Sequence, residues 1–155
     1  MYLLLGFCSF RLRLIGIVSA LLTLVAWDVA SAACLLGDYS VRGEFERSVA
    51  VLVGTVVGER ATPAQENFYE GVTYSVKTEE TLRGQAPAIV ELFSENSSGR
   101  FPMEKGRKYV LFIYKGLNRL AVDNCGNSGL YTEKQDVLKV VRQLAKATHR
   151  SQKPK

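Results

Sequence analysis

The sequence is poor in histidine, and this excludes two large classes of catalytic site. The only histidine among 155 residues is His149, which lies between basic residues near the C-terminus. A catalytic triad and a histidine-rich metal site both need imidazole groups in the folded body. Glu79 and Glu80 are adjacent, so on a strand they point to opposite faces and make a poor acid–base couple. We therefore expect no enzyme, no cofactor and no metal site of the protein's own.

The sequence also lacks a hydrophobic run long enough to span a bilayer. Its longest apolar stretch, residues 14–27, ends at Asp28, short of the roughly 18–20 residues that a span needs. Two arginines precede this stretch, and an Ala-Ser-Ala cleavage pattern follows it. These features predict a secretory signal peptide over residues 1–32, with an uncleaved anchor as the alternative. After cleavage we expect no membrane span and a secreted or periplasmic location.

Cysteines are few, and one of the three is expected to leave with the signal. Removal of Cys8 leaves Cys34 and Cys125 in an oxidising compartment, where an even pair normally bridges. We predict a Cys34–Cys125 disulfide, which stabilises the fold by about 4 kcal/mol on the chain-entropy model. The alternatives are two free thiols or a lipid on Cys34. Ser31 disfavours the lipid, because a lipoprotein signal normally carries an apolar residue at that place.

Positive charge is scarce in the body of the chain and concentrated at its end. Residues 139–155 contain six basic residues and no acidic one, whereas residues 33–138 contain 12 basic and 14 acidic residues. A nucleic-acid binder should show a positive stripe on its folded face, so we expect no nucleic-acid partner. The basic end is typical of a solvated helix face that complements the helix dipole. Residues 149–155 are predicted to form a basic disordered tail.

Strand patterns dominate what remains after the signal. Alternating or continuous apolar residues predict five strands, at residues 48–57, 71–82, 88–94, 108–115 and 118–124. Val72, Tyr74 and Val76 alternate with polar residues, which is typical of a half-buried strand. Residues 108–115 are apolar on both faces and should be central. Gly54 inside the first strand indicates a bulge or a sharp bend. Five strands separated by turn residues predict a small barrel or a sandwich.

One long amphipathic helix follows the strands. Its apolar stripe consists of Val137, Leu138, Val141, Leu144 and Ala145. Because these residues recur at helical spacing, they should pack on the sheet. Thr132 and Gln135 fit a capping box, so the helix is predicted over residues 132–148. A weaker helical segment, residues 38–47, precedes the first strand. Residues 33–148 have the length of one ordinary domain.

Several segments occur in an order that is characteristic of one family. A signal ending at a cysteine is followed by VAVLVGTVV, YSVKTEETLRG, FPMEKGRKYVLFIY and DNCGNSG, and then by a helix. This order resembles the netrin-like, or tissue inhibitor of metalloproteinases-like, family, in particular its small prokaryotic secreted members. The resemblance covers residues 34–145. It implies an OB-like five-stranded barrel with a C-terminal helix, which acts by protein–protein contact.

The sequence departs from the family pattern in two places. Inhibitors of the animal type usually begin with a Cys-x-Cys pair, whereas ACLLG supplies only Cys34. The cysteine that usually precedes the glycine-aromatic strand is absent from ENSSGRFPMEKG. The first disulfide of the family is therefore missing. If Cys34 bridges Cys125, this single bond must anchor the N-terminal segment alone.

The resemblance implies that the functional end of the protein is Cys34. In the family mechanism, the α-amino nitrogen and the carbonyl oxygen of a terminal cysteine chelate the catalytic zinc of a protease in trans. Cleavage after Ala33 exposes Cys34 in this way, whereas cleavage after Ala32 leaves Ala33 in front, and both cuts remain open. Leu35 and Leu36 would contact the partner or enter the core.

The expected function is therefore a secreted, non-enzymatic protein-binding module. Its narrower form is a metalloprotease inhibitor whose partner is a zinc metalloprotease. The alternative is an envelope-associated structural or accessory domain without inhibitory activity, which includes a lipid-anchored form.

A third class of function is an oligonucleotide or anionic-polymer binder that uses the barrel face. The strand aromatics available for stacking are Tyr74, Phe93, Tyr109, Phe112 and Tyr114. Strand aromatics are more often core residues. The near-neutral body and the export signal also argue against this class.

Overall fold

The computed structural model describes residues 34, 38–65, 68–116 and 118–151. Residues 38–151 belong to one compact unit, Leu36–Lys155, and Cys34 belongs to a second unit, Met1–Leu35. The predicted signal peptide, Leu35 and Leu36 lie outside the described residues. No helix in the described part of the chain is long and apolar enough to cross a membrane.

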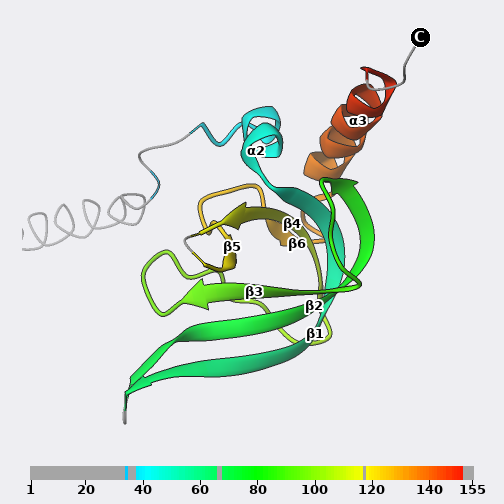
Figure 1. The fold of residues 1–155 in the computed structure, drawn as a ribbon. Coiled ribbons are helices and arrows are strands. Elements are labelled where there is room, and N and C mark those ends of the chain that lie inside the picture. Colours follow the sequence, from blue (N-terminus) through cyan, green and yellow to red (C-terminus); the bar gives the residue numbers. More distant parts are fainter. Residues whose placement is uncertain (1–33, 35–37, 66–67, 117, 152–155) are drawn as a thin grey trace, which may run out of the picture. The chain divides into compact units, whose positions relative to one another are not determined.

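A closed β-barrel forms the body of the unit Leu36–Lys155 (Figure 1). Its strands are β1 (Ala50–Gln65), β2 (Phe68–Arg83), β3 (Ile89–Glu95), β4 (Lys108–Lys115), β5 (Leu120–Val122) and β6 (Gly129–Leu130). The strand order is β1-β2-β3-β5-β4, and β4 pairs again with β1 to close the barrel. The short strand β6 adds to the edge of β4. The prediction of a mainly β, five-stranded OB-like barrel is confirmed, and β6 is an addition that the sequence pattern did not indicate.

Strand β4 separates two apolar clusters, which explains why both of its faces are apolar. Tyr109, Leu111 and Ile113 face the interior of the barrel, where they pack against residues from β1, β2 and β3. Val110 and Phe112 face outward, into a second cluster that the helices cover. The period-2 alternation of a strand therefore sends successive side chains into two different cores. The predicted central position of this segment is confirmed by its pairing with both β1 and β5.

Helix α3 (Gln135–Ser151) packs its predicted apolar stripe on the outer cluster. Leu138 and Val141 have no exposed surface, and Ala145 is buried beside them. The helix contacts β2 as well as the short helix α2 (Val41–Arg47). Burying one stripe of an amphipathic helix against a sheet removes apolar surface from water, which is the main stabilising contribution of such a helix.

The ends of α3 differ from the predicted bounds of residues 132–148. The helix begins at Gln135, because the backbone amides of Glu133 and Lys134 both donate to the Leu130 carbonyl and form a turn instead. The predicted capping box at Thr132 is therefore wrong. At the other end the helix continues to Ser151. Residues 149–151 are accordingly helical, and only residues 152–155 of the predicted tail lie outside the described part.

Helix α2 (Val41–Arg47) precedes the barrel, within the segment where a weak helical pattern predicted a helix over residues 38–47. Ser40 caps it, since its hydroxyl oxygen accepts a hydrogen bond from the Gly43 amide at 3.1 Å. A Cβ on Gly43 would lie 2.2 Å from Asp38 Oδ2, so a larger residue there would displace the exposed Asp38 side chain. Phe45 is buried in the outer cluster, so α2 and α3 cover the same face of the barrel.

The β1–β2 hairpin is longer than predicted and extends beyond the barrel (Figure 1). Strand β4 pairs with β1 only from Ala50 to Thr55, whereas β1 continues to pair with β2 as far as Gln65. Gly54 lies at a register shift, as its position in the strand predicted. A Cβ on Gly54 would lie 2.6 Å from Val76 Cγ1. Beyond Thr55, β1 therefore pairs with β2 alone among the described strands.

Candidate functional site

Both cysteines of the predicted bridge are disulfide-bonded. The prediction of a disulfide is confirmed, and the alternative of two free thiols is wrong. Disulfides persist in oxidising compartments and are rare in the reducing cytosol. The bond therefore indicates an extracytoplasmic location. Cys34 is exposed, and Cys125 is half-buried.

The loop that carries Cys125 joins β5 to β6 and is tied down by hydrogen bonds at both ends. The Cys125 amide donates to Asp123 Oδ1 at 2.8 Å. Ser128 at the other end accepts a hydrogen bond from the Phe112 amide of β4 at 2.9 Å. Ser128 is itself buried. The Asp123 bond therefore closes a turn within the loop, and the Ser128 bond fixes the loop to β4.

A buried carboxylate clamps the middle of the same loop. Glu44 of α2 has no exposed surface. Its carboxylate accepts hydrogen bonds from the Tyr114 hydroxyl at 2.8 Å, and from the backbone and side-chain nitrogens of Asn127 at 2.6 Å each. Burial of a charge is costly unless hydrogen bonds replace the lost water. Three donors meet that requirement here, so Glu44 joins α2, β4 and the Cys125 loop. We name this group, Glu44, Tyr114, Gly126 and Asn127, the Glu44 clamp.

The other members of the Glu44 clamp fit the carboxylate closely. A Cβ on Gly126 would lie 2.1 Å from Glu44 Oε1, so only glycine allows the carboxylate to approach the loop. Burial, together with the hydrogen bond to Glu44, raises the pKa of Tyr114 well above its usual value. Tyr114 therefore keeps its proton and remains a donor at any ordinary pH. The Asn127 side chain also donates to the Tyr39 carbonyl at 2.8 Å, just before α2.

The Glu44 clamp was missed by the sequence reasoning, although one signal was available. Glu44 follows Val41 by three residues and directly precedes Phe45. On a helix this places an acidic residue on the apolar face. A charge on the buried face of a helix must find donors. The donors themselves, Tyr114 and Asn127, are far away in the sequence and could not be identified from it.

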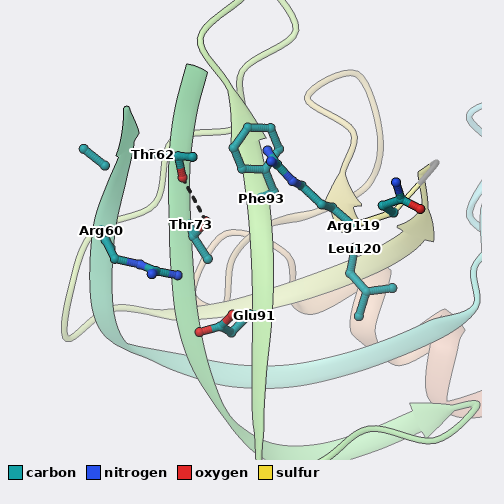
Figure 2. Close-up of a pocket in the computed structure, with 9 residues that line it drawn as sticks. Arg60, Thr62, Thr73, Glu91, Phe93, Arg119 and Leu120 are labelled. Atoms are coloured by element: carbon teal, nitrogen blue, oxygen red, sulfur yellow. Dashed lines mark hydrogen bonds between the residues drawn. The ribbon is translucent and has the colours of Figure 1, made fainter. Parts of the chain in front are cut away.

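A second feature is an open trough on the outer surface of the barrel (Figure 2). It encloses about 410 Å³ and is lined by Arg60, Ala61, Thr62, Thr73, Glu91, Phe93, Asn118, Arg119 and Leu120. The distal β1–β2 hairpin forms one wall, β3 forms the floor, and the β4–β5 connection forms the other wall. We name it the Arg119 trough. Its lining comes from four separate segments, so no single motif could have revealed it.

Arg119 is held in a defined position inside this trough. Its guanidinium lies over the ring of Phe93, with Cζ 4.3 Å from the ring centroid, as Figure 2 shows. Its Nη1 also pairs with Glu70 Oε1 at 2.8 Å. A stacked and paired arginine loses little further conformational freedom when it binds a ligand. A second hollow of about 460 Å³ shares Phe93, Asn118 and Arg119 with the first and extends toward Glu95.

The strand aromatics proposed for base stacking are mostly core residues. Tyr74, Tyr109 and Phe112 are at most 5% exposed, and Tyr114 belongs to the Glu44 clamp. Only Phe93 faces the Arg119 trough, and its ring is covered by a guanidinium. A single covered ring is a poor platform for successive bases.

The adjacent residues Glu79 and Glu80 form ion pairs with two different elements. Glu79 pairs with Lys108 of β4 at 2.5 Å, and Glu80 pairs with Arg142 of α3 at 2.6 Å. The two carboxylates thus lie on opposite faces of β2, as the strand period predicts. The part of the chain that the structure describes holds no group of three or more histidine, cysteine or acidic side chains arranged to bind a metal.

No known protein family matches the chain, and no curated protein is significantly similar to it in sequence.

Proposed function

We propose that this protein is an exported, non-enzymatic module that binds another protein through the segment that begins at Cys34, in the manner of the netrin-like family. The observation that carries the proposal is that hydrogen bonds hold the loop around Cys125 in place. Its loop is held by the Glu44 clamp and by the bond between Ser128 and β4. A partner-binding segment gains affinity when it is anchored before binding, because less conformational freedom is lost on association.

A disulfide at Cys34 is compatible with zinc chelation by the N-terminus of the exported chain. Both Cys34 and Cys125 are disulfide-bonded, so neither sulfur is available as a metal ligand. Chelation by an N-terminal cysteine uses its α-amino nitrogen and its carbonyl oxygen, which a disulfide leaves free. We therefore propose that the exported chain begins at Cys34 and fills the open coordination position of a protease zinc. Leu35 and Leu36 would then contact the cleft beside the metal.

The experiment compares three oxidised chains against a panel of zinc endopeptidases. The first begins at Cys34, the second retains Ala33, and the third begins at Cys34 but carries an acetyl group on its α-amino nitrogen. The proposal expects inhibition by the first chain and a loss of at least about a hundredfold in affinity for the other two, since an amide nitrogen is a poor zinc ligand.

The acetylated chain is the matched control, because it differs from the active chain only at the ligating nitrogen. Equal inhibition by all three chains would contradict chelation while leaving protein binding in place. Absence of binding to every protease on the panel would contradict the inhibitor form of the proposal.

A further inference from the structure

We propose that the Arg119 trough is a second recognition site, which binds an extended segment of a partner protein through an isolated acidic side chain of that segment. This site does not involve Cys34 and does not depend on the function proposed above. The observations that carry it are the arrangement of hydrogen-bond donors in the trough and the distribution of charge along it.

Donors outnumber acceptors among the side chains of the trough. Arg60, Arg119 and one carboxylate, Glu91, line the trough. Arg119 pairs with Glu70 through Nη1 only, which leaves its other N–H donors. Within the described residues Arg60 makes no ion pair and no side-chain hydrogen bond, so its five N–H donors remain for a ligand. Figure 2 shows Arg60 entering the trough from β1 while Arg119 enters from the opposite wall. A carboxylate between two arginines is the ligand that such a pair favours.

The threonine pair adds one more donor. The hydroxyl oxygens of Thr62 and Thr73 lie 3.4 Å apart, so one of them can donate to the other. Two hydroxyl groups carry two hydrogens, and the contact between them uses only one. The remaining hydrogen can point to a ligand. An uncharged donor beside two arginines strengthens the binding of a carboxylate without adding charge.

The acidic residues of the Arg119 trough and of the adjoining second hollow limit how much negative charge a ligand can carry. Glu91 lies on the floor of the first hollow, and Glu70 and Glu95 line the second. A polyanion that followed the trough would place charges against these carboxylates, which costs energy. One isolated acidic group, with neutral residues on either side, avoids this repulsion. Nucleic acid is disfavoured for the same reason, because each nucleotide brings a phosphate.

The openness of the trough favours a protein segment over a small acid. Arg60, Glu91, Asn118 and Arg119 are all exposed, whereas small-molecule sites bury most of the surface of their ligand. The two hollows together extend along β3 and past Arg119. An extended peptide can occupy this length, and Glu91 can accept a hydrogen bond from its backbone or hydroxyl groups.

The test uses the oxidised mature chain, labelled with ¹⁵N, and three capped eight-residue peptides of threonine and serine. The peptides differ only at one central position, which is glutamate, glutamine or lysine. We expect the glutamate peptide to shift the amide signals of Thr73, Phe93 and Arg119, and to bind at least about fivefold more tightly than the glutamine peptide. The lysine peptide should bind most weakly.

Variants separate the proposed contacts from general electrostatics. Arg60→Gln and Arg119→Gln should each weaken binding of the glutamate peptide by about fivefold, and Glu91→Gln should strengthen it by about threefold. Arg142→Gln is the matched control, because Arg142 is also an exposed arginine paired with a glutamate but lies on α3. It should leave the affinity unchanged.

Three outcomes would overturn the proposal. The first is equal affinity for the glutamate and glutamine peptides, and the second is the absence of signal shifts in the trough with any peptide. The third is tighter binding of an eight-nucleotide thymidine strand at the same residues. All of these results are independent of whether the chain begins at Ala33 or Cys34, so they leave the function proposed for the N-terminal segment untouched.

Discussion

The Glu44 clamp and the Arg119 trough use similar side chains for opposite purposes. Each combines a carboxylate with an aromatic residue and an amide-bearing side chain. In the clamp the carboxylate is fully buried and accepts three hydrogen bonds. In the trough the charged groups stay exposed, and Arg60 has no side-chain partner within the described residues. A satisfied, buried cluster holds a fold together, whereas an exposed cluster with spare donors can take a ligand.

The Glu44 clamp should therefore contribute to stability, and the Arg119 trough to binding. Removing one member of a buried charged network leaves the other members unsatisfied, which costs far more than the loss of a surface pair. Among the described residues, every buried side-chain nitrogen or oxygen has a hydrogen-bond partner. Substitutions in the clamp should therefore change the free energy of unfolding, and substitutions in the trough should change only binding.

The largest effect is expected for Glu44→Ala. The substitution leaves the Tyr114 hydroxyl and the Asn127 backbone amide without their acceptor, and it removes one of the two acceptors of the Asn127 side chain. We expect a loss of about 3 kcal/mol in the free energy of unfolding, measured by urea denaturation of the oxidised chain. Glu46→Ala is the matched control, because Glu46 is an exposed glutamate on the same helix. A loss below about 1 kcal/mol at Glu44 would mean that the clamp is not a structural anchor.

A smaller loss is expected for Gly126→Ala. The added methyl group would lie 2.1 Å from Glu44 Oε1, so either the loop or the carboxylate must move. We expect a destabilisation of about 2 kcal/mol by thermal or urea unfolding. Gly99→Ala serves as the control, since its Cβ would meet nothing nearer than Ser97 Oγ at 3.7 Å. Equal stability of the two variants would show that the loop has room beside Glu44.

Tyr114→Phe should have a weaker effect than either clamp substitution above. It removes one of three donors to Glu44 and leaves the aromatic ring in place. A loss of about 1 kcal/mol in the free energy of unfolding is expected, with little change in the shape of the fold. Because the pKa of Tyr114 is raised in the folded state, the native chain should also resist ionisation of this tyrosine in an ultraviolet titration. Ionisation near the usual pKa of 10.0 would contradict its role as a buried donor.

Arg119→Ala should leave stability almost unchanged although it removes an ion pair. Arg119 and Glu70 are each 46% exposed, and exposed pairs contribute at most about 1 kcal/mol. Urea denaturation should therefore give a midpoint close to that of the native chain. A loss as large as that of Glu44→Ala would remove the distinction between the clamp and the trough.

The smallest effect concerns the exposed pair between Glu79 and Lys108, and it depends on pH. The hydrogen bond from Lys108 lowers the pKa of Glu79 in the folded state. A lowered folded-state pKa contributes stability above the ordinary value of 4.5, and this contribution is lost as the pH falls through the lowered value. Native chain and Glu79→Gln should therefore differ slightly at pH 7 and converge in acid. A difference that grows in acid would contradict the sign of this shift.

The apolar periodicity of the chain predicted the parts of the fold that are held by burial. Residues 108–115 are apolar on both faces because β4 lies between two cores, and the stripe of α3 marks the face that it buries. The distal part of β1 was not predicted, because Glu59, Arg60 and Thr62 give no apolar alternation. It is held by pairing with β2 rather than by burial. The two-residue strand β6 is too short to leave a pattern.

Both polar sites depend on contacts between distant segments, which a pattern of neighbouring residues cannot reveal. Glu44 and Asn127 meet because α2 packs beside the β5–β6 loop. Arg60, Glu91 and Arg119 meet because the barrel brings the hairpin, β3 and the β4–β5 connection to one surface. The disulfide could be predicted, because removal of the predicted signal would leave only two of the three cysteines. Leu35 and Leu36 stay predictions, since they lie outside the described residues.

The proposed function rests on the identity of the first residue of the exported chain, which intact-mass and N-terminal sequence analysis of the secreted product determines. The expected product begins at Cys34, lacks the two thiol hydrogens that a disulfide removes and carries no lipid. A product that begins at Met1 would contradict export, and one with a lipid on Cys34 would identify an envelope-anchored domain. A product that begins at Ala33 would contradict zinc chelation by the terminal cysteine.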